Sequence, residues 1–137
     1  MTPSKIIDNI YLGDMNNAYF NPDKYVIVNI SKDIPIYNKN RRSLRIPIDD
    51  DPSENILMYK NVFLDFIDEN KSYPILVHCF AGISRSPSFV IMYLMCKKGC
   101  NFDQAYKFVK AKRFIVSPND GFIKQLRYLN NTKESNL

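Results

Sequence analysis

The chain has 137 residues, of which 45% are hydrophobic and 24% are charged. This size predicts a single domain over residues 1–137, with a frayed, polar tail over about 129–137. The net charge of +5 permits phosphoprotein, nucleic-acid or anionic-lipid partners. No apolar run approaches the roughly 18 residues of a membrane-spanning helix, and the amino terminus lacks a signal-peptide core. We therefore expect a soluble, cytoplasmic protein without membrane insertion.

The cysteine and histidine content argues against two kinds of site. Cys79, Cys96 and Cys100 make an odd number without a Cys-x-x-Cys pair, which disfavours a secreted disulfide framework and favours a reducing compartment. Cys96 lies in an apolar stretch and is expected in the core. The single histidine leaves a zinc site without a ligand set. We expect no metal and no other cofactor.

The hydrophobic pattern predicts strands among helices, and hence an α/β sandwich. The run at 25–30 is apolar on both faces and predicts a central strand. Asn101 is the expected cap of a helix, and Ser117-Pro118 the expected opening of the last helix. In chain order, the expected elements are a strand at 10–12, a short helix at 15–20, strands at 25–30 and 43–46, a helix over 53–70, a strand at 74–78, and helices at 86–95 and 102–113.

The segment 78–86, HCFAGISRS, places a cysteine after the apolar strand and an arginine six residues later. The loop delivers Cys79 to a helix N-terminus, which favours both a thiolate and a bound phosphate and should pull the thiol pKa from ~8.5 toward or below neutrality. Arg85 can hold two phosphoryl oxygens, and Gly82 lets the backbone approach the ligand. Taken alone, each residue has an ordinary structural interpretation, Cys79 as a small core residue and Arg85 as a surface charge. The motif specifies five residues, His78, Cys79, Gly82, Arg85 and Ser86. These five residue types should occur at this spacing by chance in a chain of this length only about once in 10⁵.

Cleavage of a phosphoester also needs a proton for the departing oxygen. Asp49, Asp50 and Asp51 are the candidate donors. Asp51 precedes Pro52, which predicts an N-cap with proline at the first helical position. Three adjacent carboxylates should raise the pKa of at least one of them, because like charges disfavour joint ionisation.

The segment 78–86 resembles the H-C-x-x-G-x-x-R-S signature of the cysteine-based phosphatases. Other segments narrow this resemblance to the small dual-specificity protein phosphatases; they are 9–13 (NIYLG), 46–50 (IPIDD), 81–87 (AGISRSP), 93–95 (YLM), 117–122 (SPNDGF) and Gln125-Leu126. The resemblance covers essentially the whole chain. It implies a short twisted β-sheet flanked by helices on both faces, with the phosphate-binding loop between a strand and a helix.

The resemblance also implies roles for individual residues. Asp50 matches the general acid of the family's Ile-Pro-x-x-Asp loop, with Asp49 as the second choice. Ser86, which could also be a plain helix cap, would bond the Cys79 sulfur and help it leave. His78 would orient the loop, and Arg113 with Asn119 would support it, Arg113 resembling the family's second basic patch. The implied phosphate loop consists of Cys79, Phe80, Ala81, Gly82, Ile83, Ser84 and Arg85.

The expected activity is hydrolysis of phosphotyrosine, phosphoserine and phosphothreonine in phosphorylated proteins through a phosphocysteine. An RNA 5′-phosphatase suits the basic charge, but Ser86-Pro87 differs from the Arg-Thr-Gly ending of RNA-acting relatives, so a nucleic-acid partner is not favoured. A phosphoinositide phosphatase would favour lysine or extra arginine in the loop, which has none. A phospho-binding pseudophosphatase would lack Cys79, Arg85 or the loop acid. The sequence predicts no oligomeric state.

Overall fold

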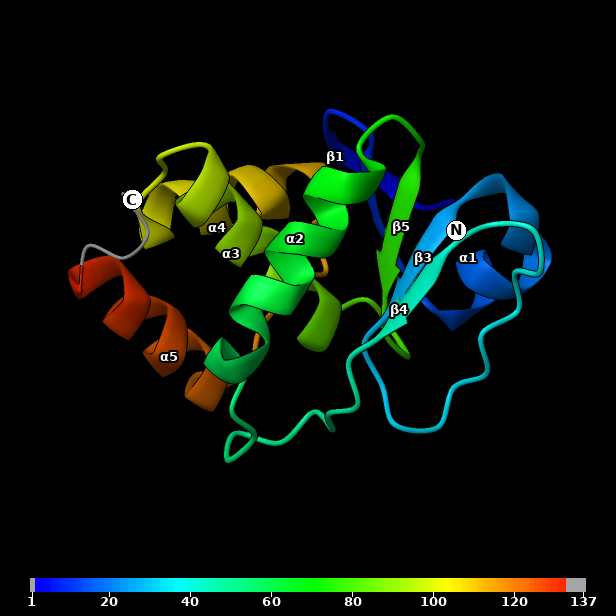
Figure 1. Ribbon diagram of the computed structural model, residues 1–137. Helices are drawn as coiled ribbons and strands as arrows, with labels where there is room; N and C mark the ends of the chain where they lie inside the picture. The colour runs from blue at the N-terminus through cyan, green and yellow to red at the C-terminus, as the bar shows by residue number, and fades with distance from the viewer. Residues whose placement is uncertain (1, 133–137) are drawn as a thin grey trace.

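The computed structural model describes residues 2–132, which form a five-stranded sheet covered by helices (Figure 1). The strand order is β1-β2-β5-β3-β4; the β1–β2 pair is antiparallel and the other three pairs are parallel. Every residue of β5 is buried, as expected for the middle of a parallel sheet. The strands are β1 Ser4–Ile7, β2 Ile10–Gly13, β3 Val26–Asn29, β4 Ser43–Arg45 and β5 Ile75–His78.

Five α-helices and two short 3₁₀ turns connect and cover these strands. α1 lies on one face of the sheet, whereas α2, α3, α4 and α5 lie on the other (Figure 1). Capping boxes start two of the helices, Asp14 with Asn17 at α1 and Asn101 with Gln104 at α4. The helices are α1 Met15–Phe20, α2 Lys60–Asn70, α3 Arg85–Lys97, α4 Phe102–Lys112 and α5 Asp120–Asn131, and the 3₁₀ turns are η1 Pro22–Lys24 and η2 Leu57–Tyr59.

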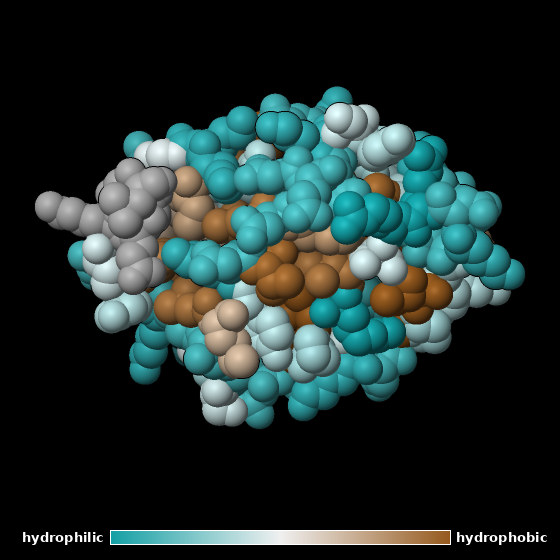
Figure 2. Space-filling model, viewed as in Figure 1, coloured by the Kyte–Doolittle hydropathy of each residue, from teal (hydrophilic) through white to brown (hydrophobic). Residues whose placement is uncertain are grey.

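Alternating side chains divide the core between the two faces of the sheet. Leu12, Val28 and Val77 belong to the larger cluster, which is packed under α2–α5. Ile27 and Leu76 belong to the smaller cluster, beneath α1. On the molecular face seen in Figure 2, hydrophilic residues surround a central hydrophobic patch. The predicted α/β sandwich with helices on both faces is confirmed.

The four parallel strands end on the same side of the sheet, so the segments that follow them lie together at the carboxyl ends of the strands. Gly13 pairs with His78, His78 with Asn29, and Asn29 with Arg45, so these strands end side by side. The chain after β3, β4 and β5 leaves from the lower edge in Figure 1. Carboxyl ends of parallel strands are the usual place for a ligand. This edge carries the predicted phosphate loop.

Several expected boundaries were wrong. No helix begins at Asp51, because its Oδ1 accepts the Ser53 N–H and O–H, both at 2.8 Å, and closes a turn instead. The last helix begins at Asp120, since Asn119 supplies the cap by accepting the Phe122 N–H at 2.9 Å. The predicted tail begins too early, because α5 continues to Asn131; residues 133–137 lie outside the described residues.

Three further differences concern the sheet and the core. β1 was not predicted, and it pairs with β2 at one edge. The middle position belongs to β5, and β3 lies beside it. Cys96 is half-buried rather than fully buried. Among residues 2–132, no helix is both long and apolar enough to cross a membrane.

Packing of α5 on the segment before α2 makes Gly121 sensitive to substitution. A Cβ at Gly121 would overlap the backbone carbonyl of Pro52. We expect Gly121→Ala to lower the free energy of unfolding by about 1–3 kcal/mol, as overpacking does. Helix propensity alone would predict a gain of about 1 kcal/mol.

Denaturant unfolding measures this difference, and Lys124→Ala, at an exposed position of the same helix, is the control expected to stay within about 0.5 kcal/mol of wild type. A Gly121→Ala protein as stable as wild type would contradict the close packing of α5 on Pro52.

Candidate active site

A small cup forms where β5 ends at His78 and α3 begins at Arg85. Cys79 lies in this cup with only 3% of its surface exposed. The segment between strand and helix is the predicted phosphate loop. The cavity has a volume of about 180 Å³ and is lined by Asp50, Cys79, Phe80, Ala81, Ile83, Ser84 and Arg85.

Buried Arg113 holds the loop from below. Its Nε donates to the Gly82 carbonyl at 3.1 Å, and its Nη2 donates to the Ala81 carbonyl at 3.3 Å. Gly82 has φ of +69°, and a Cβ there would lie 2.6 Å from the Gly13 carbonyl oxygen. Only glycine meets both requirements without strain. Arg113 is 3% exposed, so it contacts the loop from inside the protein and its charge is not presented at the surface.

The remaining loop carbonyls are also bound by the protein. The Met15 N–H donates to the Phe80 carbonyl at 3.0 Å, and the Ser117 N–H donates to the Ile83 carbonyl at 2.7 Å. By contrast, the N–H groups of residues 80–84 donate to no acceptor among residues 2–132. Such N–H groups beside a helix N-terminus form a binding site for an anion.

Two neighbours of Cys79 contact its sulfur and its carbonyl. The Ser86 Oγ lies 3.1 Å from the Cys79 Sγ, inside the first turn of α3, so Ser86 is not the helix cap. His78 Nδ1 donates to the Cys79 carbonyl at 3.2 Å. Burial lowers the His78 pKa from its ordinary 6.5 to about 4, so the ring is neutral at physiological pH.

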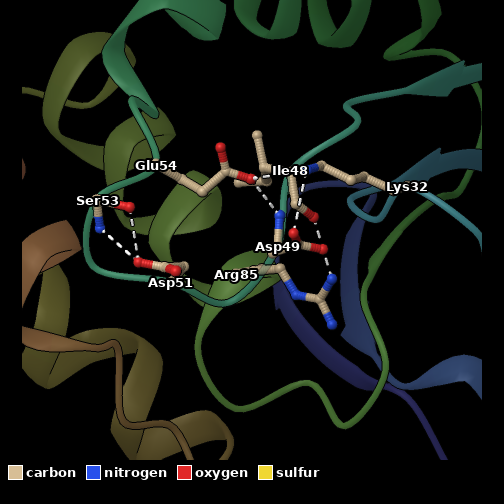
Figure 3. A network of polar contacts seen from close by, with 7 residues as sticks. All are labelled: Lys32, Ile48, Asp49, Asp51, Ser53, Glu54 and Arg85. Carbon is tan, nitrogen blue, oxygen red and sulfur yellow. Dashed lines mark hydrogen bonds and ion pairs between the residues drawn. The ribbon is translucent and has the colours of Figure 1, made fainter.

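Arg85 connects the cup to the segment that carries the aspartates. Its guanidinium Nη1 donates to the Ile48 carbonyl at 3.1 Å (Figure 3). The side chain is half-buried and lines the cup, so its other nitrogens are available at the rim. The planar guanidinium is suited to bidentate recognition of phosphate oxygens.

The three adjacent aspartates have different surroundings. Asp50 lines the cup, and its Oδ1 accepts the Asn119 amide N–H at 2.9 Å. Asp49 does not line the cup; it pairs with Lys32 at 3.0 Å, and Glu54 accepts its backbone N–H (Figure 3). The Asp51 carboxylate turns back onto Ser53.

Crowding of these carboxylates does not raise the pKa of Asp51. The N–H and O–H of Ser53 stabilise its charged form and lower this pKa below the ordinary value. The pKa of Asp51 is therefore set by its hydrogen bonds with Ser53, and the raised pKa that the sequence led us to expect for at least one of the three aspartates is not found at Asp51.

Comparison with known proteins gives the family. The model of the dual specificity phosphatase catalytic domain matches residues 10–132. The chain belongs to this family. A putative tyrosine phosphatase, 123R, of Invertebrate iridescent virus 6 is 38% identical over 142 residues, covering 96% of this chain and 97% of the viral protein.

Two further relatives of this dual-specificity phosphatase domain differ in length. A probable dual specificity protein phosphatase of Dictyostelium discoideum is 38% identical over 130 residues, covering 90% of this chain. The chain spans only 33% of that relative. The crystal structure of human DUSP28 matches with a TM-score of 0.88 at 25% identity, covering 95% of this chain and 93% of that one.

Sequence reasoning missed several residues that position the site of this phosphatase domain. Lys32 and Glu54 hold Asp49, and Ser4 accepts from Arg113 Nη1 at 3.3 Å. Lys32 and Ser4 are distant in the chain from Asp49 and Arg113, and no local motif marks them; Glu54 is only five residues from Asp49. Among residues 2–132, no group of three His, Cys, Asp or Glu side chains is arranged to hold a metal ion.

Burial of neutral His78 makes the stability of the phosphatase domain depend on pH. The unfolded chain binds this proton near pH 6.5 and the folded chain only near pH 4. Between these values the unfolded state holds more protons, so stability falls as pH is lowered through this window. The loss should approach about 3 kcal/mol near pH 4.

His78→Asn keeps a donor for the Cys79 carbonyl but removes the titration. Because His78 is the only histidine, the slope of unfolding free energy against pH between 5 and 6.5 should flatten in this variant. An unchanged slope would contradict a buried neutral His78.

Proposed function

We propose that this protein hydrolyses phosphotyrosine, phosphoserine and phosphothreonine in proteins through a phosphocysteine intermediate. The observation that carries this proposal is one cup holding Cys79, Arg85 and Asp50 together, with Ser86 3.1 Å from the sulfur. Family membership supports the same reaction class. Phosphorylated proteins are the proposed partners, and the three free cysteines support an intracellular, reducing setting.

In the first step, the Cys79 thiolate attacks phosphorus. An S–P bond forms while the P–O bond to the substrate oxygen breaks. Asp50 donates its proton to the departing oxygen, and Arg85 with the loop N–H groups balances the phosphoryl charge in the transition state. The products are a phosphocysteine and the dephosphorylated side chain.

In the second step, water attacks the phosphocysteine. The Asp50 carboxylate takes a proton from the water, the new P–O bond forms and the S–P bond breaks. The sulfur leaves as a thiolate, which the Ser86 O–H stabilises by donating a hydrogen bond. Inorganic phosphate is released and Asp50 is protonated again.

The surroundings of the aspartates support Asp50 as the general acid. Asn119 donates to the Asp50 carboxylate and orients it at the rim of the cup. Asp49 instead pairs with Lys32 at 3.0 Å and does not line the cup. The shallow rim, with Phe80, Ala81 and Ile83 exposed, suits short phosphoserine and phosphothreonine as well as phosphotyrosine.

The charge around the cup disfavours the RNA 5′-phosphatase. A groove adjoins the cup and is lined by Met15, Asp33, Ile34, Pro35, Asp49, Asp50, Phe80 and Arg85. Among residues 2–132, Arg85 is the only cationic residue that lines the cup or this groove, whereas Asp33, Asp49 and Asp50 also line them. A polyanion would be repelled here despite the net charge of +5. The pseudophosphatase alternative loses support because Cys79, Arg85 and Asp50, the residues proposed for the reaction, all line the cup.

Replacement of Cys79 by Ser tests the nucleophile. A hydroxyl preserves the loop but is not ionised near neutral pH, so turnover of phosphopeptides should fall below about 1% of wild type. Binding of tungstate, measured calorimetrically, should persist within about tenfold. Turnover well above that level would exclude Cys79 as the nucleophile.

Asp50→Asn tests the general acid. Hydrolysis of a phosphotyrosine peptide should fall by about 10²–10⁴-fold, whereas an aryl phosphate with a weakly basic leaving group should lose much less, since it needs no proton. The alkaline fall of the rate profile should flatten in the same variant. Asp49→Asn is the matched comparison, and a selective loss there instead would transfer the role to Asp49.

A further inference from the structure

A groove adjoins the phosphate cup and shares three of its residues. Asp50, Phe80 and Arg85 line both cavities, so the groove begins at the rim where the phosphorylated residue would enter. With a volume of about 450 Å³, it is larger than the cup. Its remaining lining residues are Met15, Asp33, Ile34, Pro35 and Asp49.

Buried polar side chains hold one wall of the groove in place. Asn29 Nδ2 donates to the Ile34 carbonyl at 2.8 Å, and Ser31 Oγ donates to Asn29 Oδ1 at 2.6 Å. Arg45 donates to the carbonyls of Ser31 at 3.0 Å and Ile34 at 2.7 Å. Asn29 and Ser31 are fully buried. The Asp33 backbone is therefore tied on both sides to the end of β3 and to β4.

Asp33 differs from the other two carboxylates of the groove. Asp49 is paired with Lys32, and Asp50 accepts from Asn119. Asp33 is exposed and has no hydrogen bond or ion pair among residues 2–132. The groove therefore presents an unpaired negative charge beside its entrance.

The other lining residues offer apolar surface. Phe80 is 57% exposed, and Met15, Ile34 and Pro35 complete this part of the lining. A lysine or arginine stem lies favourably along apolar surface while its charged end stays in water. The Phe80 ring can also attract a cation. Apolar lining and carboxylate together fit a basic side chain better than a neutral or an acidic one.

We propose that this groove selects phosphoproteins in which lysine or arginine flanks the phosphorylated residue, and that Asp33 is the specificity-determining residue. The inference depends on the proposed phosphatase function. The phosphate occupies the cup against Arg85, and the flanking basic side chain extends along Phe80 to Asp33. An acidic neighbour is disfavoured by the same carboxylate.

A positional scan of phosphotyrosine peptides tests this selection. Arg, Gln or Glu is placed singly at each of two positions on either side of the phosphotyrosine, and kcat/KM is measured. At one position at least, Arg should exceed Gln by about threefold to fivefold, a gain typical of an exposed ion pair. The preference should shrink between 50 mM and 500 mM salt. Asp33→Asn should bring the Arg-to-Gln ratio close to one.

Asp65→Asn is the matched control, since Asp65 is an exposed carboxylate on α2 that lines neither cavity. It should keep the wild-type ratio. Equal rates for Arg and Gln peptides at every position, or an undiminished preference in Asp33→Asn, would overturn the inference while leaving the phosphatase function intact. Hydrolysis of an aryl phosphate without hydrolysis of any peptide would overturn both.

Discussion

The site depends on one constraint, which is that the carbonyl groups of its loop accept hydrogen bonds from other parts of the protein. Carbonyls of residues 80–83 accept hydrogen bonds from the backbone of Met15 and Ser117 and from the side chain of Arg113. With its acceptors bound by the protein, the loop retains free donors for an anion. These partners come from two parts of the chain that are both distant from the loop in sequence, Met15 before it and the 113–117 segment after it. The phosphate cup is therefore a product of the whole fold, although its residues are consecutive.

The same arrangement connects the residues proposed to bind phosphate with the proposed general acid. Arg85 contacts the Ile48 carbonyl, two residues before Asp50, and Asn119 joins Asp50 to the start of α5. The Asn119 N–H in turn donates to Ser84 in the loop at 2.9 Å. Hydrogen bonds through Arg85 and Asn119 thus tie the segment that carries Asp50 to the loop that carries Cys79. This arrangement reduces the reorganisation needed for the reaction.

The distribution of charge carries more information than its total. The chain is basic, yet its cup and groove contain three aspartates and one arginine. Several cations instead have structural partners: Arg113 lies beneath the loop, Arg45 holds the 31–34 backbone, and Lys32 pairs with Asp49. Because burial and pairing remove these charges from recognition, net charge is a poor guide to the ligand of this site.

The sequence alone was sufficient for the fold class and for the strand–loop–helix unit around Cys79. Hydrophobic periodicity and the 78–86 motif are local signals, and the spacing of Cys79 and Arg85 follows directly from the chain. Asn101 was recognised as a cap for the same reason, since its partner Gln104 is three residues away. Competition between local turns was harder to judge, and at Asp51 the turn with Ser53 prevailed over a helix.

Only the tertiary structure decided that Asp49 and Asp50 have different partners, that Arg113 is buried and that Asp33 lies beside the cup. Adjacent aspartates have the same local chemistry, and they differ here because Lys32 meets one and Asn119 the other. The amino-acid sequence determined which reactive groups the protein carries. Packing of four parallel strand ends at one edge decided which of those groups face one another, because contacts between residues distant in the chain leave no local pattern.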